Sequence, residues 1–254
     1  MGKNKLKKFE DMERLENVFQ CSMKEISPDN PVVRMAGQWR SLFFHNTNPL
    51  VLELGCGHGE YTVGLAQRYP DRNFIGIDIK GARMWAGAKF ADEQKLPNVA
   101  FLRASIEFLP VFFAPDEVDE IWITFPDPQM KKATKRLTST FFMQRYLRLM
   151  RAGGLVNLKT DSPFLYTYTR AMLQENACHV LADTADLYSE DMQDSRFLNA
   201  SALKTHYERQ WLDRGMTIKY LCWELCPLPE WREPDIEIEK DTYRSYGRNY
   251  TVSQ

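Results

Sequence analysis

Three alternate glycines follow an apolar run near residue 50, in the stretch Val51-Leu52-Glu53-Leu54-Gly55-Cys56-Gly57-His58-Gly59-Glu60. Alternate glycines allow a tight turn and let a ligand approach the backbone without interference from Cβ atoms. Asp78 ends the next apolar run, where a carboxylate can bind both hydroxyls of a ribose. The pattern therefore predicts a cofactor loop formed by Glu53, Gly55, Gly57, Gly59 and Asp78. A strand–helix turn without a ligand is the alternative that the glycines alone leave open.

The second stretch with residue types suited to chemistry is Phe125-Pro126-Asp127-Pro128-Gln129-Met130-Lys131-Lys132. A carboxylate between two prolines is held on a stiff backbone, as a preorganised binding group should be. Lys131 and Lys132 follow at once, and Lys135 and Arg136 come shortly after. This basic cluster can bind the backbone of a polyanion, although a run of charges is also typical of a solvated surface.

Two further polar segments lie later in the chain, Lys159-Thr160-Asp161-Ser162 and Thr205-His206-Tyr207-Glu208. Each by itself fits a polar turn or a helix cap, and Ser162 before Pro163 suits a cap well. The four histidines show no metal-ligand spacing, so no metal site is predicted. Cys222 and Cys226 form the one close pair of cysteines and are predicted to be buried thiols on a strand.

Strands and helices alternate from Pro49 onwards. The apolar patterns predict strands over residues 50–54, 73–79, 99–102, 117–124, 155–159 and 217–225. Helices are predicted over residues 60–69, 81–94, 138–150 and 163–175, the third of them ending at two glycines. This alternation predicts an α/β, Rossmann-like fold, a mostly parallel sheet with helices on both faces. Because ligands bind beyond the carboxyl ends of such strands, we expect Glu53, Asp78, Asp127 and Asp161 to lie around one site.

Three segments are predicted: an N-terminal extension over residues 1–48, a central α/β domain over 49–226 and an acidic C-terminal tail over 227–254. The extension begins with Lys3, Lys5, Lys7 and Lys8, which suit either a basic arm or a solvated tail. A helix is predicted from Arg34 to Phe44. The acidic tail is expected to be exposed.

The composition limits the class of protein. The 254 residues carry a net charge of −1, which argues against a strongly cationic nucleic-acid binder, although local patches can still bind RNA. No stretch reaches the roughly 20 apolar residues of a membrane span, and the start lacks the apolar region of a signal peptide. Five scattered cysteines predict reduced thiols and a cytoplasmic location.

The motifs described above, taken in their order along the chain, resemble those of a known protein family. The E-x-G-x-G-x-G spacing differs from the G-x-G-x-x-G of nicotinamide-binding proteins, and it resembles motif I of S-adenosylmethionine-dependent methyltransferases. With F-P-D-P-x-x-K-K, K-T-D and T-x-[FY]-E following in order, the chain resembles the bacterial tRNA (guanine-N7-)-methyltransferase family from about Val51 to Tyr220. The resemblance implies a class I methyltransferase domain, S-adenosyl-L-methionine as cofactor and tRNA as partner. It further implies methyl transfer to N7 of the variable-loop guanine (position 46 of tRNA).

The resemblance also implies roles for individual residues. The active-site aspartate corresponds to Asp127, and the cofactor-binding residues correspond to Glu53, Gly55, Gly57, Gly59, Asp78, Ser105 and Asp127. The substrate-binding residues correspond to Lys131, Asp161, Thr205, His206, Tyr207 and Glu208. Two positions depart from the family: Gln129-Met130 stands where Trp-Pro is usual, and Ser105 aligns where an aspartate is frequent. A monomer or homodimer is expected.

Three other hypotheses remain. One is a methyltransferase of small molecules or proteins, for which the lysines after Asp127 are ordinary surface charge. Another is a non-catalytic RNA-binding subunit with a vestigial cofactor loop. The third, a nicotinamide-dependent oxidoreductase, lacks the expected glycine spacing. Trp85, just after the second acidic strand end, is predicted to pack in the core, with stacking on an adenine as the alternative.

Overall fold

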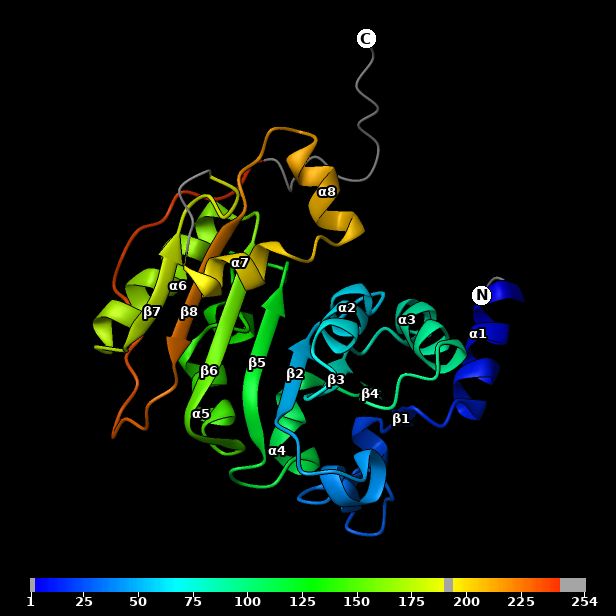
Figure 1. The fold of residues 1–254 in the computed structure, drawn as a ribbon. Helices are drawn as coiled ribbons and strands as arrows, with labels where there is room; N and C mark the ends of the chain where they lie inside the picture. The colour runs from blue at the N-terminus through cyan, green and yellow to red at the C-terminus, as the bar shows by residue number, and fades with distance from the viewer. Residues whose placement is uncertain (1–2, 190–193, 243–254) are drawn as a thin grey trace.

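A single mixed sheet runs through the computed structural model of the chain, which describes residues 3–189 and 194–242 (Figure 1). Within these ranges the strand order is β1-β4-β3-β2-β5-β6-β8-β7. The strands are β1 (Val18–Gln20), β2 (Leu50–Leu54), β3 (Asn73–Ile77), β4 (Val99–Arg103), β5 (Val118–Thr124), β6 (Met150–Thr160), β7 (Val180–Thr184) and β8 (Lys219–Glu224). Strands β1 to β6 pair in parallel, whereas β8 runs antiparallel to both of its neighbours. After β2 the sheet extends to one side through β3 and β4, and the chain then returns to the other side of β2 at β5. The strand order therefore reverses between β2 and β5.

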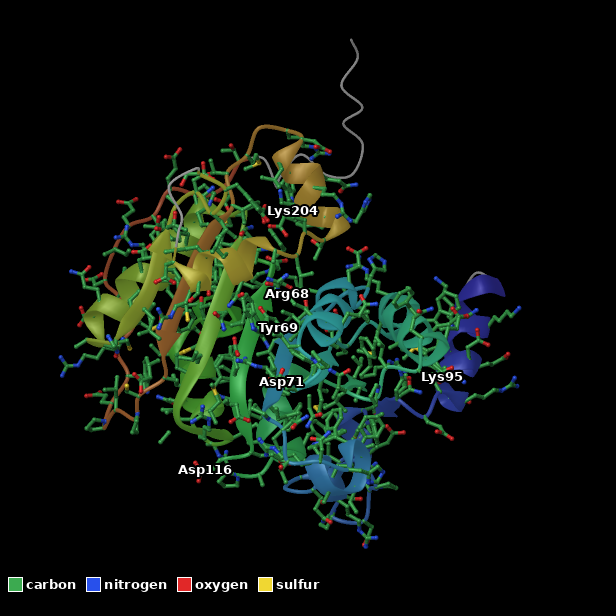
Figure 2. All side chains as sticks on the ribbon, viewed as in Figure 1. Arg68, Tyr69, Asp71, Lys95, Asp116 and Lys204 are labelled. Atoms are coloured by element: carbon green, nitrogen blue, oxygen red, sulfur yellow. The ribbon has the colours of Figure 1, made fainter. Side chains whose placement is uncertain are left out.

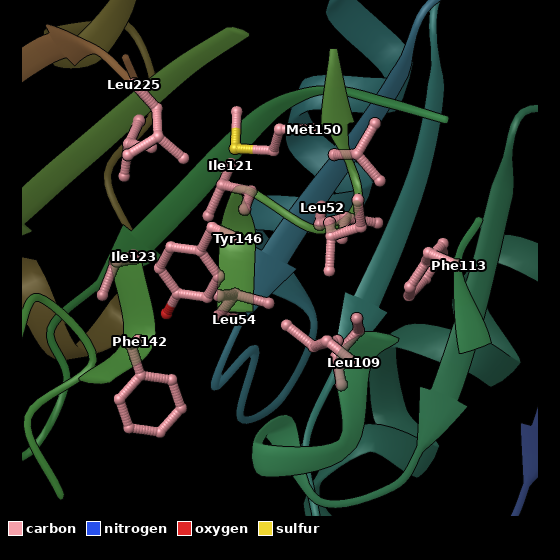
Figure 3. Packing of buried hydrophobic residues seen from close by; sticks show 14 of the residues in the cluster. Leu52, Leu54, Leu109, Phe113, Ile121, Ile123, Phe142, Tyr146, Met150 and Leu225 are labelled. Carbon is pink, nitrogen blue, oxygen red and sulfur yellow. The ribbon is translucent and has the colours of Figure 1, made fainter. Parts of the chain in front are cut away.

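Helices cover both faces of the sheet. One face packs against α4 (Leu109–Phe112), α5 (Thr140–Tyr146) and α6 (Pro163–Glu175), and part of this core is shown in Figure 3. The other face packs against α2 (Glu60–Arg68), α3 (Gly81–Glu93), α7 (Ser195–Ser201) and α8 (His206–Leu212), and α1 (Lys3–Arg14) packs against α3. Along β2, Leu50, Leu52 and Leu54 face the first core and Val51 faces the second, as the period of two requires. The predicted α/β, Rossmann-like fold is confirmed.

The predicted strands and helices within the central domain are confirmed, with shifts at their ends. The largest shift concerns the helix predicted to end at Gly153 and Gly154. Helix α5 ends at Tyr146, and both glycines lie within β6, which begins at Met150. The pairing of β5 and β6 has an irregularity at this point, and Gly153 has a φ of +71° there, which glycine adopts without strain. Strand β7 was not predicted.

Residues 1–48 contribute to the sheet and to the core. Strand β1 pairs in parallel with β4, and Trp39 is fully buried with its Nε1 donating to the Phe112 carbonyl at 2.8 Å. The helix predicted from Arg34 to Phe44 is wrong: a 3₁₀ turn (Val33–Met35) and a π-helix (Trp39–Phe44) flank Gly37 instead. Gly37 has a φ of +78°, and its backbone N–H and that of Trp39 both donate to the Glu117 carboxylate. The predicted boundary at residue 48 stays a prediction.

The C-terminal residues 227–242 only partly match the expected exposed tail. Their carboxylates Glu230, Glu233, Asp235, Glu237 and Glu239 are exposed, whereas Asp241 is buried. Trp231 is also buried, against the core formed by α5 and α6. Residues 243–254 of the predicted tail lie outside the described residues.

The remaining sequence predictions concern membrane spans, metals and thiols. No helix among the described residues is long and apolar enough to cross a membrane. The same residues contain no group of three or more His, Cys, Asp or Glu side chains that could hold a metal ion. All five cysteines are free; Cys222 is buried in β8, as predicted, and Cys226 is half-buried just after it.

Candidate active site

The glycine loop connects the end of β2 to helix α2. Gly55, Gly57 and Gly59 have φ angles of +78°, +56° and +76°, which other L-residues rarely adopt. A Cβ at Gly55 would have no atom within 4 Å, and one at Gly57 would meet only the Gly55 carbonyl at 3.9 Å. A Cβ at Gly59 would lie 2.6 Å from the Phe101 ring. The first two glycines therefore leave open space beside the backbone, whereas the third is required by packing.

Asp78 holds this loop at the end of β3. One of its carboxylate oxygens accepts from the Gly57 backbone N–H at 3.0 Å, and the other accepts from the Lys80 N–H at 2.8 Å. The Gly55 N–H also donates to the Ile77 carbonyl at 2.8 Å, which folds the loop over the end of β3. The half-buried carboxylate thus lies at the edge of the open space next to Gly57.

Glu53 has a different environment from the one that its predicted role suggests. Its side chain is buried, and its oxygens accept from the Thr62 N–H at 2.8 Å, from the Thr62 hydroxyl and from the Thr124 hydroxyl at 2.6 Å. Burial raises the pKa of Glu53 to about 7, although these hydrogen bonds act in the opposite direction. The carboxylate therefore joins β2, α2 and β5 beneath the loop.

Asp127 follows β5 in a short loop of unusual backbone conformation. Phe125 and Gln129 on either side have φ angles of +49° and +47°, a strained region for residues other than glycine. Pro126 and Pro128 are buried and Asp127 is exposed, with its Oδ1 accepting from the Gln129 N–H at 3.0 Å. Strain of this kind clusters at functional sites, where the surrounding structure maintains it.

Arg136 is the residue that maintains this loop. Its guanidinium donates to the carbonyls of Gln129 and Met130, at 3.2 Å each, and lies over the Tyr168 ring at 4.3 Å. Arg136 is only 8% exposed, and Lys135 pairs with Glu107. The four residues of the predicted basic cluster therefore have different environments. Arg136 is buried and Lys135 forms an ion pair, whereas Lys131 and Lys132 are exposed and take part in no ion pair among the described residues.

Thr205, His206, Tyr207 and Glu208 form the first turn of α8. The Thr205 side chain caps the helix by accepting from the Glu208 N–H, and Glu208 reaches back to the Thr205 N–H. This capping box explains the T-x-x-E spacing in purely structural terms. Tyr207 lies edge-on against Phe125 at 5.7 Å between ring centroids, so α8 reaches the loop of Asp127.

Two further contacts join α8 to the rest of the site. The His206 N–H donates to the carboxylate of Glu60, the first residue of α2, at 2.6 Å. Glu208 forms an ion pair with Lys159 of β6 at 2.8 Å, and both side chains are fully buried. The first turn of α8 is consequently in contact with the ends of the glycine loop, β5 and β6. Glu208, although predicted to bind substrate, faces the protein interior.

Asp161, after β6, is also fully buried, and its backbone carbonyl accepts from the Lys219 ammonium at 3.3 Å. Burial lowers the pKa of Lys219, while the charges of Asp161, Asp241 and Asp186 act in the opposite direction. Asp161 therefore lies at the predicted end of the sheet, but beneath the surface.

Ser105 and Trp85 lie beyond β4 and β3. Ser105 is half-buried and precedes the 3₁₀ turn Ile106–Phe108. The Trp85 indole donates to Asp11 of α1 at 3.1 Å, and the ammonium groups of Lys8 and Lys89 lie 4.7 and 5.2 Å from its ring centroid. Trp85 is half-buried and packs against the edge of the core, so its predicted role in packing stays a prediction.

The parallel register brings these segments together. Leu54 pairs with Ile77 and with Ile123, and Thr124 pairs with Lys159, so the loops that follow β2, β3, β5 and β6 share one edge. Sequence reasoning missed the supporting residues Thr62 and Thr124, and it named Arg136 and Lys159 without their supporting roles. Only Lys159 had a signal, because a lysine inside an apolar strand requires a partner.

Known proteins resemble this chain over nearly its whole length. The family model "Putative methyltransferase" matches residues 47–221. A tRNA (guanine-N(7)-)-methyltransferase of Bacteroides fragilis is 55% identical over 98% of this chain and 96% of its own length. The protein of the same name from Porphyromonas gingivalis is 54% identical over 94% of this chain and 97% of its own.

Solved structures support the fold. The 16S rRNA methyltransferase KamB superposes with a TM-score of 0.56 at 18% identity, covering 75% of this chain and 92% of its own. Identity this low shows the fold alone, whereas the relatives above match nearly the full length at high identity. The chain therefore belongs to the tRNA (guanine-N(7)-)-methyltransferase family.

Proposed function

We propose that the protein transfers a methyl group from S-adenosyl-L-methionine to N7 of the variable-loop guanine, position 46, of tRNA. The observation that carries the proposal is the juxtaposition of the open glycine loop with the stiff loop of Asp127 at one edge of the sheet. The family membership of the chain supports tRNA as the substrate.

The residues around the glycine loop fit this cofactor. The open space beside Gly55 and Gly57 allows a ligand to approach the backbone, and the Asp78 carboxylate at its edge can accept from ribose hydroxyls. Ser105 follows β4, the strand next to β3, and we assign it to the base of such a nucleotide. When bound, the cofactor supplies a methyl group on a positively charged sulfur. Glu53 supports the loop from beneath through Thr62 and Thr124.

Guanine N7 is a lone-pair acceptor and carries no proton. No general base is needed, so the work of the protein is to align the base. Asp127 is exposed on its stiff loop and is suited to accept from the guanine N1–H and N2 amine, which also offsets positive charge growing on the ring. Asp161 is buried, so we assign it to shaping the site through Lys219.

The remaining substrate contacts are assigned to exposed residues. Lys131 can contact phosphate, and the exposed His206 and Tyr207 present a polar and an aromatic surface on the turn that contacts Phe125 of the Asp127 loop. Thr205 and Glu208 hold that turn in place. The free cysteines are consistent with a reducing cytoplasm, and we propose that the protein acts there as a monomer or homodimer.

The deciding experiment incubates the protein with labelled methyl donor and total tRNA from cells that lack the modification, and then maps the modified base. Label at N7 of guanine 46 is expected. Transfer to another nucleotide would contradict the proposed site, and transfer only to protein or small molecules would support the alternative methyltransferase. Cofactor binding without any transfer would support the non-catalytic subunit.

A further inference from the structure

Glu60 lies at the junction between the glycine loop and helix α8. It is the first residue of α2 and directly follows Gly59, which packs so closely against Phe101 that a Cβ would lie 2.6 Å from the ring. The glycine loop therefore sets the backbone position of Glu60. The side chain extends to the other helix, where one carboxylate oxygen accepts from the His206 N–H at 2.6 Å. His206 is the first residue of α8, and a carboxylate there is favoured by the free N–H groups of the helix start.

Helix α2 contacts the segment that contains α7 and the start of α8 at two further points. A Cβ on Gly64 would lie 3.0 Å from the Leu203 side chain, so this glycine lets the two segments pack closely. The Tyr69 hydroxyl, just after α2, donates to the Asn199 side chain at 2.9 Å. Figure 1 shows α7 and α8 on the side of the sheet that also carries α2. This segment therefore rests along α2, with the Glu60 bond at the end next to the glycine loop.

The other contacts of the first turn of α8 reach different parts of the molecule. Glu208 pairs with Lys159 of β6 in the interior, and Tyr207 contacts Phe125 of the loop after β5. The Glu60 bond instead joins the turn to the helix that continues from the cofactor loop. It thereby relates the surface assigned to the guanine to the surface assigned to the methyl donor.

Methyl transfer depends on how these two surfaces are placed. Reacting atoms must meet at about 3–3.5 Å in the correct alignment, and a displacement of about 1 Å can lower the rate about 100-fold. We propose that Glu60 is a positioning residue, which holds the turn of His206 and Tyr207 in register with the glycine loop. The proposal rests on the methyl transfer to tRNA proposed above, and it requires no contact between Glu60 and either ligand.

The test compares Glu60→Ala and Glu60→Gln of the full protein in steady-state methylation of unmodified tRNA. Glu60→Gln retains an oxygen that can accept from the His206 N–H, whereas Glu60→Ala does not. Glu93→Ala is the matched control, because it removes an exposed carboxylate at the end of α3, where Glu93 pairs with Lys89 at 3.6 Å. Affinity for S-adenosylhomocysteine and the unfolding midpoint report the integrity of each variant. Hydrogen exchange of the α8 amides reports how firmly the turn is held, without any substrate.

Glu60→Ala is expected to lower kcat about 10- to 100-fold, with KM changed by less than about threefold and both integrity readouts unchanged. Its α8 amides are expected to exchange about tenfold faster than those of the parent. Glu60→Gln and Glu93→Ala are expected to stay within about threefold of the parental kcat.

A parental kcat for Glu60→Ala would overturn the proposal, and so would an equal loss in Glu60→Gln. A raised KM at unchanged kcat would also overturn it, because that result marks an ordinary binding contact. If the parent methylated no tRNA, the proposed function would fail. Unchanged exchange of α8 in Glu60→Ala would then overturn the positioning role independently.

Discussion

Lys159 and Glu208 form an ion pair of 2.8 Å although they are 49 positions apart and neither side chain is exposed. The Lys159 ammonium also donates to the carbonyls of Ala200 and Leu203, and the Tyr188 hydroxyl donates to Glu208 at 2.6 Å. Burial lowers the pKa of Lys159, while the charge of Glu208 acts in the opposite direction. A buried charge is tolerated only with such partners, so this pair determines where α8 packs.

Lys159→Met should therefore be strongly destabilising, because it leaves the Glu208 carboxylate buried without its partner. The expected loss in the free energy of unfolding is about 3–5 kcal/mol, measured by urea denaturation. Arg209→Met on the exposed side of α8 should change it by less than about 0.5 kcal/mol. A small effect of Lys159→Met would mean that the pair does not hold α8 in solution.

Asp127→Ala should abolish most methyl transfer while the protein stays folded. The side chain is exposed and accepts one local backbone hydrogen bond, so its loss costs little stability. The expected decrease in kcat/KM for tRNA is at least about 100-fold. Asp116→Asn is the matched control, because Asp116 is exposed, has a φ of +60° and lies at the opposite end of the sheet (Figure 2). Near-parental activity of Asp127→Ala would remove its assigned role.

Glu53 should make the stability of the protein depend on pH. Its pKa is raised in the folded state from an ordinary 4.5 to about 7, so the folded state holds this proton more tightly than the unfolded state does. The resulting stabilisation is complete below pH 4.5 and disappears as the pH rises through 7, a change of about 3 kcal/mol. The side chain of Glu53→Gln does not titrate. The difference in unfolding free energy between this variant and the parent should therefore change by about 3 kcal/mol as the pH rises from 4.5 through 7. Parallel pH profiles would contradict the raised pKa.

Lys131→Ala and Arg136→Ala should have different effects, because these two residues of one basic run lie in different environments. Lys131 is exposed, so its loss should weaken tRNA binding and lower the salt slope by about 0.8, with stability unchanged. Arg136 is buried under two rings and holds the Asp127 loop, so its loss should lower the unfolding midpoint and kcat. An unchanged salt slope for Lys131→Ala would indicate an ordinary solvated lysine.

The sequence by itself determined the central architecture and the chemistry of the site. Apolar runs of strand length alternate with helical patterns, and parallel strands must then place their carboxyl ends at one edge. That constraint predicts that Gly55, Asp78 and Asp127 lie near one another. The order of the motifs was enough to indicate the family, because local residue types and spacing are properties of the chain itself.

Only the tertiary structure decided which polar residues face the solvent. Glu53, Asp161 and Glu208 resemble ligand-binding residues in sequence, yet each is buried because partners from distant segments surround it. Arg136 and Lys131 are five positions apart in one basic run, but a turn and the rings of α6 bury the first alone. The incorporation of β1 into the sheet and the anchoring of residues 227–242 at Asp241 likewise depend on long-range contacts. A one-dimensional pattern contains no information on which distant surface a residue will meet, and burial is determined by that surface.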